Sequence, residues 1–62
     1  MQINVMNKMC TFHAHSPADG VTPFPHAVAP NGTVFVRLPS LAWRKQNDAE
    51  KLLWSKGVAR IL

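Results

Sequence analysis

All five prolines of this 62-residue chain lie between residues 17 and 39. Proline lacks a backbone N–H, so it excludes a regular helix from this stretch and confines any strand there to a sheet edge or to unpaired extended chain. Residues 41–56 contain neither proline nor glycine. We therefore predict a turn-rich, hairpin-forming part over residues 1–38, a basic helix over 40–57 and a tail over 58–62.

The clearest local signal in the first part is the segment Ala29-Pro30-Asn31-Gly32-Thr33. Proline suits the first central position of a type I turn, and glycine suits the left-handed position that completes a three-residue hairpin loop. We expect a hairpin whose register pairs Val28 with Val34, Ala27 with Phe35 and His26 with Val36. In this register Val34, Val36 and Leu38 form the expected core face.

The segment before this hairpin carries weaker signals. Residues 3–15 alternate loosely between apolar and polar side chains, which allows a strand. The run Ser16-Pro17-Ala18-Asp19-Gly20 favours a chain reversal. The first 38 residues are thus expected to form one or two hairpins.

The last third of the chain predicts one helix over about residues 41–56. Pro39-Ser40 is suited to a stop and an N-cap, and Gly57 to a left-handed C-cap. Asn47, followed three residues later by Glu50, resembles a capping box, so two short helices joined near Gln46 are the alternative. The expected fold is a small α+β single domain in which the helix packs on the hairpins.

The chain is short for an independent fold. A domain of this size buries only about 60% of the surface of its unfolded chain, and such domains usually gain support from disulfides, a metal or a partner. One cysteine, Cys10, excludes an internal disulfide. Homodimerisation is one way in which the chain could gain the missing burial.

Basic side chains are concentrated toward the C-terminal end. Six of the seven Lys and Arg residues lie in residues 37–62 with both tryptophans, and the net charge is +4. In a single helix the two tryptophans would be about three turns apart on one side. They would then either present a binding face or cover the hairpin as core. The candidate site residues are Arg37, Trp43, Arg44, Lys45, Lys51, Trp54, Lys56 and Arg60.

Two partner classes fit such a face. Aromatic stacking surfaces among cations are typical of single-stranded nucleic-acid sites, and a basic patch attracts phosphate. Trp and Arg are also enriched among protein-interface hot spots. We therefore expect a small non-catalytic regulator that binds nucleic acid. The alternative is a protein-binding module, an inhibitor or adaptor that meets an acidic protein surface through the same face. Adsorption to an anionic membrane ranks below both, because the leucines and tryptophans do not form one apolar face.

Catalytic, metal-binding and membrane-spanning signals are sparse. Cys10, His13, His15 and His26 are the candidate metal ligands, but their spacing does not match that of familiar zinc modules, so we expect no metal or other cofactor. No phosphate loop, paired carboxylates or nucleophile elbow is present, and we expect no enzyme. No apolar stretch approaches the 20 or so residues of a membrane span. With a single thiol and no signal-peptide pattern, the expected location is cytoplasmic.

Overall fold

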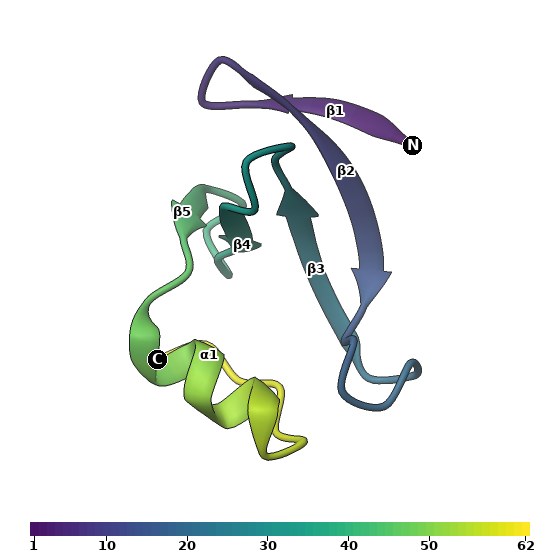
Figure 1. Cartoon of the computed structure of the whole chain (residues 1–62), viewed down its shortest axis with the longest axis vertical. Coiled ribbons are helices and arrows are strands. Elements are labelled where there is room, and N and C mark those ends of the chain that lie inside the picture. The colour runs from purple at the N-terminus through teal and green to yellow at the C-terminus, as the bar shows by residue number, and fades with distance from the viewer.

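The computed structural model describes all residues from 1 to 62 and shows a curled five-stranded antiparallel sheet with one C-terminal helix (Figure 1). The α+β class expected from the sequence is confirmed. The elements are β1 (Gln2–Val5), β2 (Lys8–His15), β3 (Pro23–Val28), β4 (Val34–Arg37), β5 (Trp43–Lys45) and α1 (Asp48–Ser55).

The strands follow one another in space in their chain order, so every strand pairs with its sequence neighbour. The sheet has more hairpins than the one or two expected from residues 1–38. The additional turn between β1 and β2 consists of Met6 and Asn7, both with positive φ angles, 51° and 66°. Left-handed backbone at both positions is typical of a type I′ hairpin turn, which glycine normally marks in a sequence.

The hairpin between β3 and β4 has the register expected from its loop. Val28 pairs with Val34, Ala27 with Phe35 and His26 with Val36. Gly32 has a φ of 91°, and the N–H of Ala29 donates to the carbonyl of Thr33 to close the loop. A proline and a glycine at fixed positions were therefore enough to set the alignment of two strands.

The expected position of the proline-bearing strand was wrong, since β3 is the central strand of the sheet. Its two prolines, Pro23 and Pro25, lie in its first half, whereas pairing with β4 begins only at His26. On the other side the register with β2 shifts between His13 and His15. The prolines thus occupy a stretch that is open along the β4 side, where a missing N–H breaks no ladder bond.

The helix is shorter than the predicted span of residues 41–56. Leu41 has a left-handed φ of 68° and its N–H donates to the carbonyl of Leu38, which makes a turn where the helix was expected to start. Residues 43–45 then pair with β4 as strand β5. The lack of proline and glycine in this stretch favoured a helix. The open edge of β4 instead satisfies its backbone N–H and C=O groups by strand pairing.

The helix starts at the capping box of Asn47 and Glu50, so of the two short helices allowed as the alternative only the second forms. The side chain of Asn47 accepts a hydrogen bond from the N–H of Glu50, and the carboxylate of Glu50 accepts one from the N–H of Asn47. The helix ends before Gly57, whose φ is 83°. Residues 58–62 form no strand and return along the helix, so the C-terminus lies beside the start of α1 (Figure 1).

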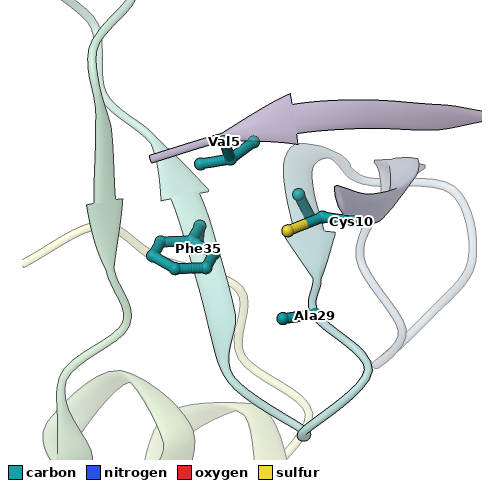
Figure 2. Close-up of a cluster of buried hydrophobic side chains, with 5 residues drawn as sticks. Val5, Cys10, Ala29 and Phe35 are labelled. Carbon is teal, nitrogen blue, oxygen red and sulfur yellow. The ribbon is translucent and has the colours of Figure 1, made fainter. Parts of the chain in front are cut away.

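The main apolar cluster lies on one face of the sheet, named here the core face. It consists of Val5, Cys10, Ala27, Ala29 and Phe35, with Ile3 and Trp43 packed against it. The sheet curls so far that Val5 of β1 reaches Phe35 of β4, three strands away (Figure 2). The expected core face of Val34, Val36 and Leu38 is therefore only part of the interior: Val36 is fully buried but faces the helix, and the other two are half-buried.

The opposite face, named here the helix face, is covered by α1 through one ion pair and aromatic contacts. The register aligns His13, His26, Val36 and Arg44 in one row across β2 to β5. Glu50 of α1 meets Arg44 at one end of this row, and Trp54, one turn further along α1, meets His26 near its middle. A charged pair and an aromatic contact therefore join α1 to the sheet.

Candidate functional site

The structure separates the two tryptophans that a single helix would have placed on one side. Trp43 lies on the core face at the edge strand β5, and Trp54 lies on α1 over the helix face. Both side chains are half-buried. The proposed common face therefore does not exist as one surface, because residues 43 and 54 belong to different elements on opposite sides of the sheet.

Trp43 belongs to a cluster that combines aromatic and basic side chains. The guanidinium carbon of Arg37 lies 5.2 Å from the centroid of the Trp43 ring, a cation–π contact across the β4–β5 pair. Phe12 of β2 meets the same ring edge-on at a centroid distance of 6.4 Å. Lys45, two residues along β5, projects from the same face and is exposed. We call Phe12, Arg37, Trp43 and Lys45 the sheet-edge cluster.

Trp54 has the environment of a packing residue. Its ring contacts Phe24 at a centroid distance of 5.1 Å and His26 at 5.0 Å, both edge-on. Its indole Nε1 is buried and makes no hydrogen bond. Trp54 thus fixes α1 to β3. For this tryptophan, the interpretation as a core residue that covers the hairpin fits the contacts.

The remaining basic residues of the predicted site divide into paired and free groups. Arg44 forms the only salt bridge of the chain, with Glu50, and is committed to the helix face. Lys45, Lys51, Lys56 and Arg60 are exposed and have no acidic partner. Together with the half-buried Arg37, these four side chains supply the accessible positive charge of the C-terminal half.

A groove of about 590 Å³ opens between the β2–β3 hairpin and α1. Its lining includes three histidines, His13, His15 and His26, together with Ser16 and Trp54. The rings of His13 and His26 stack with 16° between their planes and 4.9 Å between their centroids. The groove is therefore rich in imidazole and carries no lysine, arginine or carboxylate in its lining.

His26 is the buried member of the stacked pair, at 3% exposure. Its Nδ1 lies 2.8 Å from the carbonyl oxygen of Phe24, so Nδ1 carries the proton and donates. Burial lowers the pKa of His26, and the neighbouring His13 lowers it further, against the opposing effect of the Phe24 hydrogen bond. The imidazole is therefore held neutral, with its lone pair on Nε2.

The four candidate metal ligands do not converge on one site, and only His13 and His26 are in contact. Cys10 is fully buried in the core-face cluster, whereas His13 and His26 lie on the helix face. No group of three or more His, Cys, Asp or Glu side chains forms a metal site.

The contacts of Phe12 and Phe24 with the tryptophans were not predicted from the sequence, nor was the pairing of the two histidines. The β2–β3 connection is a seven-residue loop, residues 16–22, and a loop of this length does not fix a strand register as a two- or three-residue turn does. The only signal available was the alternation along β2, which places residues 11 and 13 on one face of the sheet and residues 10 and 12 on the other.

No protein-family model, curated protein or solved structure matches this chain. The only helix, α1, is neither long enough nor apolar enough to cross a membrane.

Proposed function

We propose that this protein is a small non-catalytic regulator that binds single-stranded nucleic acid through the sheet-edge cluster. The observation that supports this proposal is the stack of the Arg37 guanidinium on Trp43, with Phe12 against the ring and Lys45 exposed on the same face. Base stacking on an aromatic ring contributes about 1–3 kcal/mol per base.

The cluster combines the two kinds of contact that such binding needs. A base stacks on Trp43 or on the planar guanidinium of Arg37, and Lys45 neutralises a phosphate beside it. The half-buried rings of Phe12 and Trp43 are held by the sheet, so little side-chain entropy is lost when a base binds.

The helix favours a single strand over a duplex as the ligand. Helical readers insert a helix into the major groove, but α1 has eight residues and directs Glu50 and Trp54 into contacts with the sheet. Its exposed Lys51 and the nearby Lys56 attract the phosphates of the ligand at long range, and they do not stack on its bases.

The test is a fluorescence titration with a short oligothymidylate at low salt, using Trp54→Phe so that Trp43 is the only tryptophan. Saturable quenching of Trp43 is expected. Lys45→Gln should weaken binding and reduce the slope of log K against log salt by about 0.7, the value for one phosphate contact on a single strand.

Two controls locate the interface. Trp43→Phe leaves Trp54 as the reporter, whose fluorescence is expected to stay constant, while anisotropy of a labelled oligothymidylate should show weakened binding. Lys51→Gln removes the same charge from α1 and should cost less affinity than Lys45→Gln. An absence of quenching at low salt would refute nucleic-acid binding, and an equal loss in the two lysine variants would move the contact away from the sheet edge.

Protein binding is the second candidate function, supported by exposed large apolar side chains. Met6 and Met9 on the β1–β2 hairpin and Leu41 before β5 are each more than half exposed. Methionine adapts its shape to a partner, and Trp and Arg frequently carry binding energy. Affinity capture with the folded chain as bait separates the candidates: loss of a captured protein in Trp43→Ala but not in Lys45→Gln would favour a protein partner.

A further inference from the structure

We infer that His13 and His26 form a two-histidine chelate for a divalent transition-metal ion, with Cu²⁺ as the preferred ion. The two residues are direct cross-strand partners of β2 and β3, and their rings stack in the groove with centroids 4.9 Å apart. This inference is independent of the sheet-edge cluster, which lies on the other face of the sheet.

The hydrogen bond of His26 presets one ligand. Nδ1 donates to the carbonyl of Phe24 over 2.8 Å, which leaves the lone pair on Nε2. Metal-binding histidines almost always donate their second ring nitrogen to a carbonyl or a carboxylate in this way, because the bond fixes the tautomer and the ring orientation. His26 is therefore oriented as such a ligand before any ion binds.

His13 supplies the adjustable ligand. Its side chain is exposed, so the ring can turn about its side-chain bonds without displacing packed groups. For chelation, the His13 ring must turn out of the near-parallel stack until one of its nitrogens shares an ion with Nε2 of His26. Water completes the coordination, because the groove is open to solvent and large enough to hold several water molecules.

The donor set selects the class of ion. Imidazole nitrogen suits Cu²⁺, Zn²⁺ and Ni²⁺, and Cu²⁺ binds such sites most strongly among the divalent first-row ions. Mg²⁺ and Ca²⁺ prefer oxygen ligands, and the groove lining has no carboxylate. His15 also lines the groove but does not join the pair, since the register shifts after His13 and no third His, Cys, Asp or Glu converges with it.

Trp54 provides a built-in reporter, since its ring lies 5.0 Å from that of His26. In a Trp43→Phe background with an acetylated N-terminus, titration with Cu²⁺ is expected to quench Trp54 with one-to-one stoichiometry. His13→Gln should weaken this binding about tenfold or more, the scale of effect seen when a metal site loses a supporting group. His15→Gln removes one exposed histidine equally and should leave the affinity unchanged.

A second measurement uses Zn²⁺ and the imidazole ¹⁵N resonances, which report each nitrogen separately. Nε2 of His26 is expected to shift on Zn²⁺ addition while Nδ1 keeps its proton. Equal affinities of His13→Gln and His15→Gln for Cu²⁺ would overturn the proposal. Loss of the Nδ1 proton, or an unshifted Nε2 at saturating Zn²⁺, would overturn it independently of any folding defect in the variants.

Discussion

Arg44 of β5 and Glu50 of α1 form a two-bond ion pair in which the carboxylate is completely buried. Nη1 donates to Oε1 over 3.0 Å and Nη2 to Oε2 over 2.8 Å. The same carboxylate accepts from the backbone N–H groups of Asn47 and Leu62, each at 3.0 Å. One side chain therefore joins the edge strand, the helix N-cap and the tail.

Replacing Glu50 is expected to cost more stability than any other change of an acidic residue in this chain. Glu50→Gln leaves one amide oxygen for four donors and turns an NH₂ group toward them. Hydrogen bonds to a charged group contribute about 1.5–3 kcal/mol, so we expect a loss of about 3 kcal/mol in the free energy of unfolding. Asp48→Asn removes the same charge from an exposed position in the first turn and should cost well under half as much. Urea denaturation of both variants measures the difference.

The same carboxylate makes stability dependent on acid. Arg44, followed by the Asn47 and Leu62 hydrogen bonds, lowers the pKa of Glu50 from its ordinary 4.5 to about 2, against the effect of burial. Its contribution is therefore complete above about pH 4.5 and is lost as the pH falls through 2. Urea unfolding at a series of pH values should show this decline, and Glu50→Gln should flatten it. An equally steep decline in the variant would assign the effect to other groups.

His26 predicts a second pH dependence, at milder acidity. Because its pKa in the folded chain lies below 6.5, the unfolded chain binds the proton more readily. The contribution of neutral His26 is complete above about pH 6.5 and declines below it, and the contact of α1 with β3 should loosen as the ring becomes charged. Trp54 fluorescence in Trp43→Phe reports this contact. The transition should persist in His15→Gln and disappear in His26→Gln.

Leu41 is expected to be a site where glycine stabilises the fold. It is 69% exposed and has a φ of 68°, a conformation that costs an L-residue about 1–2 kcal/mol. Leu41→Gly should therefore raise the midpoint of thermal unfolding. Leu52 is similarly exposed, at 56%, but lies within α1, where glycine costs about 1 kcal/mol. Leu52→Gly should lower the midpoint, and a fall in both variants would show that the side chain of Leu41 stabilises the fold.

The parts of the fold that could be predicted are those in which a few neighbouring residues determine the geometry. Pro30 and Gly32 set the β3–β4 register, and Asn47 with Glu50 marked the start of the helix. Each of these signals acts within a few residues of chain, and no distant contact overrode it in this fold.

The parts that could not be predicted depend on distant partners. Residues 43–45 form a strand because β4 offers an open edge, and no local residue signals this edge. Arg37 and Trp43 were both candidate site residues, but their stacking follows from strand pairing. The candidate site was therefore predictable in its residue types and not in its arrangement.

The meander order of the strands has a consequence for how quickly the chain reaches its native state. Every strand pairing joins neighbouring hairpin arms, so only short loops close at each step and the entropic cost of each closure is small. Domains with such local connectivity fold faster than sheets built from distant strands. Residues 1–37 supply four of the five strands, and the hydrogen bond that the Leu62 N–H donates to Glu50 then needs only the neighbouring tail. The sheet is thus suited to assemble hairpin by hairpin, in the order in which a ribosome releases it.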